Sequence, residues 1–238
     1  MGQVTAIVGP TGTGKTALAL ALAQETQHEI VGADSRQIYR HMNIGTAKPT
    51  TQQQAQIPHH LIDIISPDED FSLALFLTEA RNTIANLLAQ GKEVIVVGGT
   101  GQYISALLEG WNVPNVPPNI PLRNELEEKA RVEGLESLLK ELRSLDPDAA
   151  LKVDNKNMRR IIRAIEVAKT LTGQKGNAVR KADPPWEFTA IGLTMEREDL
   201  YSRLDTRVNQ MMESGWVREV KNLLDDGFST RLPAFSSA

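Results

Sequence analysis

The sequence contains no cysteine, which excludes disulfide frameworks, thiolate metal sites, iron–sulfur clusters and cysteine nucleophiles. It also lacks a long apolar segment, since its longest wholly apolar run, residues 17–23, is far shorter than the ~20 residues of a membrane-spanning helix. The N-terminus has no charged segment of the kind that opens a secretory signal. We therefore expect a cytoplasmic protein without a membrane span.

A general excess of positive charge is absent as well. The chain has 26 Lys and Arg against 30 Asp and Glu, and the net charge of −4 excludes a uniformly cationic surface for nucleic acid. One stretch departs from this balance, because residues 151–181 contain 9 basic and only 2 acidic side chains. The basic ones are Lys152, Lys156, Arg159, Arg160, Arg163, Lys169, Lys175, Arg180 and Lys181. Such a local surplus is typical of a surface that binds RNA phosphates.

The first 113 residues alternate short apolar runs with helical patterns. Runs at 4–8, 29–33 and 94–97 are continuously apolar, which is typical of parallel strands buried on both faces. Apolar residues at helical spacing predict helices over 16–24 and 72–90. This part of the sequence predicts an α/β fold.

A different composition begins after residue 113. Residues 114–121 are rich in Pro and Asn, which break regular structure, and the apolar pattern of 122–168 then predicts about three helices. An apolar run at 189–193 is expected to return to the sheet as another strand. We therefore expect residues 114–185 to form a helical insertion domain, within an α/β core made of 1–113 and 186–238.

The strongest motif is a phosphate-binding P-loop of the form GxxxxGK[ST], placed between a predicted strand and a predicted helix. Its residues are Gly9, Pro10, Thr11, Gly12, Thr13, Gly14, Lys15 and Thr16. Glycines let backbone N–H groups converge on phosphate oxygens, Lys15 neutralises an outer phosphate, and the Thr16 hydroxyl can hold Mg²⁺. The motif predicts a bound di- or triphosphate but does not define the molecule that carries it.

Two further residues are expected at the same edge of the sheet. P-loop kinases and hydrolases usually have a second strand that ends in a Mg²⁺-binding Asp, but here the run at 94–97 is followed by Gly, Gly and Thr100. Asp34 instead follows the strand at 29–33. Because the carboxyl ends of parallel strands meet in one crevice, Asp34, Thr100 and Lys15 should lie together. Taken singly, Asp34 is equally well explained as a helix N-cap, and Thr100 is better explained as a plain turn residue.

Together these residues resemble the tRNA dimethylallyltransferase family, also called tRNA isopentenyltransferases. The resemblance spans nearly the whole chain and rests on an ordered series of motifs. After the P-loop come DSRQIY at 34–39, IGTAKP at 44–49, PHHLID at 58–63, GGTGQY at 98–103 and RAIEV at 163–167. It implies a P-loop NTPase-like parallel sheet flanked by helices, with an inserted helical domain that binds tRNA.

The resemblance also implies a reaction. The P-loop would hold the pyrophosphate of dimethylallyl diphosphate, and a dimethylallyl group would pass to N6 of the adenosine next to the anticodon on its 3′ side. Lys15, Mg²⁺ and Arg207 would stabilise the leaving pyrophosphate, with Arg203 one turn before Arg207. Asp34 would take the proton from the adenine amine, and Thr100 would help to place the target nucleotide.

The residues that the resemblance assigns to tRNA lie in three places. They are Asp34, Ser35, Arg36 and Gln37 after the second strand, then Arg123, and then Arg159, Arg160, Ile161, Ile162 and Arg163. The implied partners are the tRNA anticodon stem-loop and dimethylallyl diphosphate, Mg²⁺ is the implied cofactor, and a monomer is expected.

Three other functions compete with this one. An adenylate isopentenyltransferase shares the P-loop and Asp34 but prenylates a free nucleotide, and the basic insertion favours tRNA over it. A small-molecule kinase is disfavoured by Thr100 where an Asp is usual. A non-catalytic RNA-binding fragment is suggested only by the end of the chain, because residues 233–238 stop within a family motif. We expect a C-terminally truncated protein that lacks part of the tRNA surface.

Overall fold

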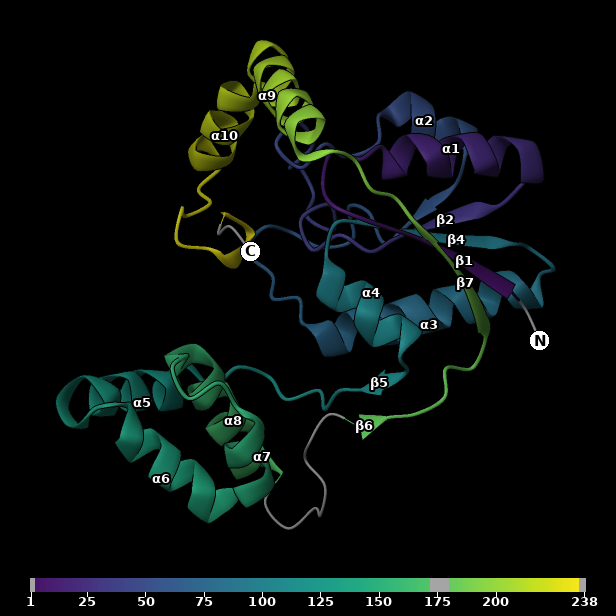
Figure 1. The fold of residues 1–238 in the computed structure, drawn as a ribbon. Helices are drawn as coiled ribbons and strands as arrows, with labels where there is room; N and C mark the ends of the chain where they lie inside the picture. Colours follow the sequence, from purple (N-terminus) through teal and green to yellow (C-terminus); the bar gives the residue numbers. More distant parts are fainter. Residues whose placement is uncertain (1–2, 172–179, 236–238) are drawn as a thin grey trace. The chain divides into compact units, whose positions relative to one another are not determined.

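The computed structural model describes residues 3–171 and 180–235 and divides into two compact units (Figure 1). The sheet unit comprises Met1–Gly110 and Asp183–Ala238, and the helical unit comprises Trp111–Ala182. The sequence analysis placed these two boundaries three residues later, after residues 113 and 185.

Five parallel strands form the sheet in the order β3-β2-β4-β1-β7. They are β1 (Gln3–Val8), β2 (Glu29–Gly32), β3 (His59–His60), β4 (Val94–Val97) and β7 (Glu187–Gly192). Every residue of β4 is buried, which explains its continuously apolar sequence. The order places the ends of β2, β4 and β1 side by side, and β7 returns after the helical unit to pair with β1, as predicted.

Helices cover both faces of this sheet (Figure 1). Figure 1 shows α1 (Lys15–Thr26) and α2 (Thr51–Gln56) on one face and α3 (Leu73–Ala89) and α4 (Gly101–Leu108) on the other. Ala19 and Ala23 of α1 belong to the same buried cluster as Ile7 and Ile30 of the strands. The chain then continues through α9 (Arg197–Glu213) and α10 (Trp216–Asp225) to a short 3-10 helix, η1 (Pro233–Phe235). The predicted fold class is confirmed.

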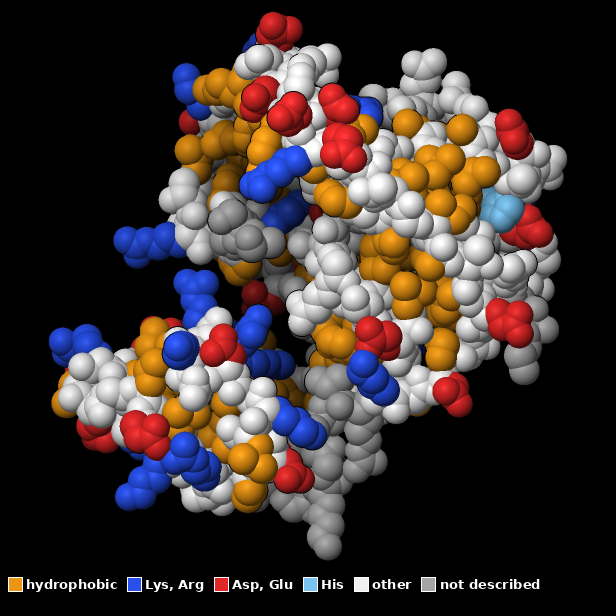
Figure 2. All heavy atoms as spheres, in the orientation of Figure 1, with side chains coloured by type: hydrophobic (Ala, Val, Ile, Leu, Met, Phe, Trp, Pro, Cys, Tyr) orange, Lys and Arg blue, Asp and Glu red, His pale blue; other side chains and the backbone are white. Residues whose placement is uncertain are grey.

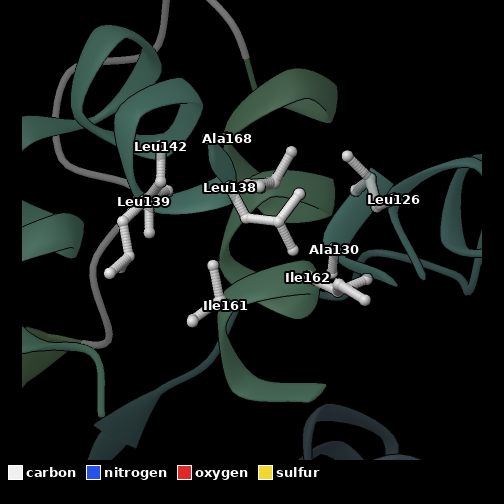
Figure 3. Packing of buried hydrophobic residues seen from close by; sticks show 9 residues of the cluster. Leu126, Ala130, Leu138, Leu139, Leu142, Ile161, Ile162 and Ala168 are labelled. Carbon is white, nitrogen blue, oxygen red and sulfur yellow. The ribbon is translucent and has the colours of Figure 1, made fainter. Parts of the chain in front are cut away.

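The described residues of the helical unit, 111–171 and 180–182, form four helices around a core of their own (Figure 3). They are α5 (Ile120–Glu133), α6 (Leu135–Leu145), α7 (Pro147–Lys152) and α8 (Met158–Thr170). The core consists of Leu126, Ala130, Leu138, Leu139, Leu142, Ile161, Ile162, Ile165 and Ala168. Two short strands, β5 (Trp111–Asn112) and β6 (Arg180–Lys181), pair antiparallel where the chain enters and leaves the unit.

Within residues 3–171 and 180–235, no helix combines the length and the apolar character that crossing a bilayer requires.

Candidate active site

The P-loop connects the end of β1 to the start of α1, as the motif predicts. Gly12 has a φ of 93°, which side chains rarely adopt, and a Cβ placed on it would lie only 3.0 Å from Leu204 Cδ2 and 3.1 Å from Leu200 Cδ1 of α9. The loop therefore has a glycine-specific backbone and is packed directly against α9. The Thr13 hydroxyl donates to the Pro10 carbonyl at 2.9 Å, which braces the turn from within.

Lys15 is buried at the base of this loop. Its ammonium donates to the carbonyls of Gly9 at 2.9 Å and Pro10 at 2.8 Å. Burial lowers the pKa of Lys15; the negative charge of Asp34 opposes this shift and the positive charge of Arg207 adds to it. Asp34 and Arg207 therefore both lie within electrostatic range of Lys15.

Asp34 and Thr100 are adjacent, because β2 and β4 are neighbours. Asp34 Oδ1 accepts a hydrogen bond from the Arg36 backbone N–H at 2.9 Å, and a Cβ placed on Gly99 would lie 2.8 Å from Asp34 Oδ2. Thr100 Oγ1 accepts from the Ser35 N–H at 2.8 Å and donates to Ser35 Oγ at 3.0 Å. The Thr100 hydroxyl thus holds the residue that follows Asp34.

A cleft of about 850 Å³ brings several predicted residues of the sheet unit together, whereas Ser35, Arg36 and Thr100 are not among the residues that line it. Lys15, Asp34, Arg203 and Arg207 line it, together with Thr16, whose exposed side chain begins α1. The charges facing this space are mostly positive, with Asp34 as the carboxylate among them. The cleft can therefore accept an anionic ligand beside the Asp34 carboxylate, which is a potential base.

The residues that follow Asp34 are used partly for structure. The Arg36 guanidinium donates to the Pro233 carbonyl at 2.7 Å, and the Gln37 amide donates to the carbonyls of Thr46 at 3.1 Å and Ala47 at 3.2 Å. Gln37 lines the cleft. These contacts fix the chain after β2 against segments that are distant in sequence.

Lys48 is a cleft residue that sequence analysis did not single out, although it lies in the IGTAKP motif. It is buried, and its ammonium donates to the Tyr39 carbonyl at 2.7 Å, Asn43 Oδ1 at 3.0 Å and Asp63 Oδ1 at 2.5 Å. Burial lowers the pKa of Lys48, and the Asp63 hydrogen bond opposes that shift. Ala47 beside it has a φ of 47°, a strained value for alanine that is found preferentially at functional sites.

Oxygen donors suited to Mg²⁺ are present at Thr16 and Asp34 in this cleft. In the described part of the chain, no group of three or more His, Asp or Glu side chains could enclose a metal ion. A cation held here would therefore need phosphate oxygens of a ligand, which agrees with a hydroxyl donor at the start of a helix.

The helical unit presents four exposed basic side chains near the junction of α7 and α8. They are Lys152, Lys156, Arg159 and Arg160. Figure 2 shows Lys and Arg side chains on one face of this unit. Lys169 instead pairs with Glu141 at 2.8 Å, and Lys175 lies outside the described residues.

Arg123 and Arg163 surround a fully buried carboxylate, Glu166. Arg123 donates to it at 3.0 and 2.8 Å, the Asn119 N–H donates at 2.5 Å, and Arg163 donates to Glu166 and, at 2.8 Å, to the Val116 carbonyl. Burial raises the pKa of Glu166, but these hydrogen bonds outweigh burial and lower it to about 2. Both arginines therefore hold the unit together; the resemblance assigns both to tRNA, and that assignment stays a prediction.

The expectation that Ile161 and Ile162 contact tRNA is wrong for their side chains. They are 0% and 3% exposed and lie in the core of the helical unit (Figure 3). The helical period turns both side chains towards α5 and α6 while Arg159 and Arg160 face solvent.

Comparison with known families gives one match over most of the chain. A family model described as IPP transferase matches residues 37–238, and one described as isopentenyl transferase matches residues 2–63.

Individual relatives agree with this match. The chain is 47% identical over 234 residues to a tRNA dimethylallyltransferase of Thermomicrobium roseum, covering 98% of this chain and 71% of the relative. It is 50% identical over 232 residues to one of Roseiflexus castenholzii, covering 97% and 76%.

Solved structures with the same fold include the full-length tRNA isopentenylpyrophosphate transferase from Bacillus halodurans. The TM-score is 0.68 at 39% identity, over all of this chain and 74% of that one. A eukaryotic dimethylallyltransferase acting on tRNA gives a TM-score of 0.76 at 27% identity, over 99% of this chain and 60% of that one.

Proposed function

The chain belongs to the IPP transferase family, and we propose that the cleft lined by Lys15, Asp34 and Arg207 is where it transfers a dimethylallyl group to tRNA. The chain is a prenyltransferase whose substrates are tRNA and dimethylallyl diphosphate. The names of its relatives favour tRNA over a free adenine nucleotide as the acceptor. We propose below which residues of this chain stabilise the leaving pyrophosphate, accept the proton and bind the RNA.

The pyrophosphate is assigned to the P-loop. Breaking the allylic C–O bond leaves negative charge on pyrophosphate, so cations around the leaving group lower the barrier. Lys15 and Arg207 supply that charge, and the presence of Lys15, Asp34 and Arg207 on the wall of one cleft is the observation that carries the assignment. The Thr16 hydroxyl would hold Mg²⁺ against the diphosphate oxygens, where the ion neutralises part of their charge.

Asp34 is assigned as the base that accepts the proton from adenine N6. As the adenine N6 forms its bond to the allylic carbon, the C–O bond breaks, pyrophosphate leaves, and N6 carries an excess proton. Oδ1 of Asp34 is engaged by the Arg36 N–H, whereas Oδ2 lies at the cleft wall beside Gly99. We assign Oδ2 as the acceptor, and Thr100 acts through Ser35 to keep this carboxylate in place.

The acceptor is proposed to be the adenosine on the 3′ side of the anticodon. A base in the anticodon loop must be extruded to reach the cleft, which costs a few kcal/mol and least where the base is unpaired. Lys152, Lys156, Arg159 and Arg160 are exposed and suited to bind stem-loop phosphates. We propose that the enzyme acts as a monomer.

Parallel assays test this function. Wild-type protein, dimethylallyl diphosphate and Mg²⁺ would be incubated with an anticodon stem-loop RNA, AMP or ATP, and prenyl transfer measured. We expect product on the RNA alone, at the adenosine after the anticodon. Transfer to AMP or ATP but not to RNA would overturn the proposal, and so would transfer to RNA that is independent of Mg²⁺.

A further inference from the structure

A carboxylate on α10 lies among the backbone N–H groups of the loop over residues 42–48, here called the 42–48 loop. Glu219 Oε2 accepts from the N–H groups of Asn43 and Ile44, both at 2.7 Å, and Oε1 accepts from the N–H of Gly45 at 3.1 Å. Three hydrogen bonds from consecutive amides to one ionised group are strong, directional contacts. None of the residues involved belongs to the proposed chemistry.

Trp216, at the start of α10, requires a glycine at position 45 of that loop. A Cβ placed on Gly45 would lie 2.1 Å from Trp216 Nε1, so the indole and the loop backbone are in direct contact. Trp216 and Glu219 are three residues apart on the first turn of α10 and thus on one face of the helix. This face is docked on the 42–48 loop by shape as well as by charge.

The loop is internally rigid and reaches the cleft. The Ala47 N–H donates to the Ile44 carbonyl at 2.9 Å, and the Lys48 N–H donates to the Asn43 carbonyl at 3.0 Å. Ala47 and Lys48 line the cleft that Arg207 of α9 also lines. A change at the Glu219 contact would therefore reach the cleft through a connected set of hydrogen bonds.

Within the sheet unit, both α9 and α10 are thus attached to loops that precede them in sequence. Leu200 and Leu204 of α9 lie against Gly12 of the P-loop, and Trp216 and Glu219 of α10 lie against the 42–48 loop. Figure 1 shows the two helices to one side of the layered sheet, where α9 and α10 join end to end. Arg207 lies in sequence between these attachments, so both are needed to fix its position.

We propose that Glu219 is a positioning residue for the transfer reaction: it fastens α10 to the 42–48 loop and thereby holds Arg207 where it meets the pyrophosphate. It touches neither substrate. The proposal rests on the proposed function, because it presumes that pyrophosphate binds between the P-loop and Arg207.

A double-mutant cycle tests this role. Calorimetry with Mg²⁺ and inorganic pyrophosphate would be performed on wild-type protein, Glu219→Gln, Arg207→Ala and the double variant. We expect Glu219→Gln to weaken pyrophosphate binding about tenfold when Arg207 is present. The same substitution should have almost no effect when Arg207 is replaced with alanine. In turnover assays, KM for dimethylallyl diphosphate should rise while KM for the RNA stays the same. Glu213→Gln, on the exposed side of α9, is the matched control and should bind as wild type.

The outcomes separate the two proposals. An equal loss with and without Arg207, or a wild-type affinity in Glu219→Gln, would overturn the positioning role while the proposed function stands. Wild-type affinity in Arg207→Ala itself would overturn the pyrophosphate site instead. Gly45→Ala perturbs the same contact from the loop and keeps the test possible if Glu219→Gln does not fold. It should also weaken pyrophosphate binding when Arg207 is present and have almost no effect when Arg207 is alanine.

Discussion

The hydroxyl groups of Thr100 and Ser35 lie 3.0 Å apart and join the end of β4 to the end of β2. The Ser35 N–H also donates to Thr100 Oγ1 at 2.8 Å, so a single hydroxyl acts as donor and acceptor across two strands. Asp34 lies directly before Ser35, so this contact fixes the backbone beside its carboxylate, whose Oδ1 also accepts from the Arg36 N–H.

Thr100→Val is expected to lower kcat about tenfold or more. Valine has the shape of threonine but leaves both Ser35 groups without a partner, so the backbone that holds Asp34 is released. The KM for dimethylallyl diphosphate should change little. Thr100→Ser restores the hydroxyl and should recover most of the rate in a steady-state assay; no difference between Val and Ser would contradict the role.

Asp34→Asn is expected to slow transfer by about 10²- to 10⁴-fold, the contribution of a positioned base. The amide keeps the size of the side chain and its contact with the Arg36 N–H, so tRNA binding should persist. Single-turnover transfer at saturating substrates measures the step directly. A rate equal to that of the wild type would exclude Asp34 as the base.

Lys15→Ala is expected to weaken the binding of pyrophosphate and to slow transfer, because the charge acts on both the bound diphosphate and the leaving group. Calorimetry with Mg²⁺ and inorganic pyrophosphate measures the first effect. Unaltered affinity for pyrophosphate together with lost affinity for ATP would favour a kinase-like use of the P-loop.

The sequence predicts the parts of this fold that depend on neighbouring residues. The strands at 4–8 and 94–97 are continuous apolar runs and the P-loop is a contiguous motif, so both were found. Helix α4 was missed because it begins with Gly101 directly after a glycine-rich turn and has only two turns.

Contacts between distant residues could not be predicted. Glu219 and Asn43 are 176 residues apart, and no periodicity relates them. The pattern at 158–168 indicates which face of α8 is apolar, but it cannot show that Arg163 turns back to a buried Glu166. Pairing of this kind depends on the tertiary fold. For the same reason, the sequence alone does not predict that Lys48 is buried beside Asp63 at the cleft.

Glu166→Gln is expected to destabilise the helical unit by about 3 kcal/mol or more, because it leaves Arg123 and Arg163 beside a neutral group. The pKa of Glu166 is lowered from 4.5 to about 2, so its contribution is present above pH 4.5 and is lost as the pH falls towards 2. Urea unfolding at several pH values should show that loss in wild-type protein and a smaller one in the variant. Parallel pH profiles for the two proteins would contradict the assignment.

The last prediction concerns Arg159 and Arg160, which are exposed at the start of α8, unlike the buried isoleucines that follow them. If they bind tRNA phosphates, replacing both with alanine should lower the affinity for all tRNA substrates similarly, because phosphates carry no sequence information. With each contact that is lost, tRNA binding releases fewer counterions. The slope of log K against log salt should therefore become shallower by about 0.7 to 0.9 per contact. Pyrophosphate binding should be unchanged, because the P-loop belongs to the sheet unit.

Affinity measured over a salt series with several anticodon stem-loops decides this question. Lys140→Ala is the control, since Lys140 is an exposed cation of the same unit on α6. A general effect of net charge would make the slope shallower in the control as well, whereas a phosphate contact at the start of α8 would change it only in the arginine variant. An unchanged slope in the double variant would mean that these arginines form a solvated helix face, and tRNA phosphates would then have to be bound by other cations of the chain.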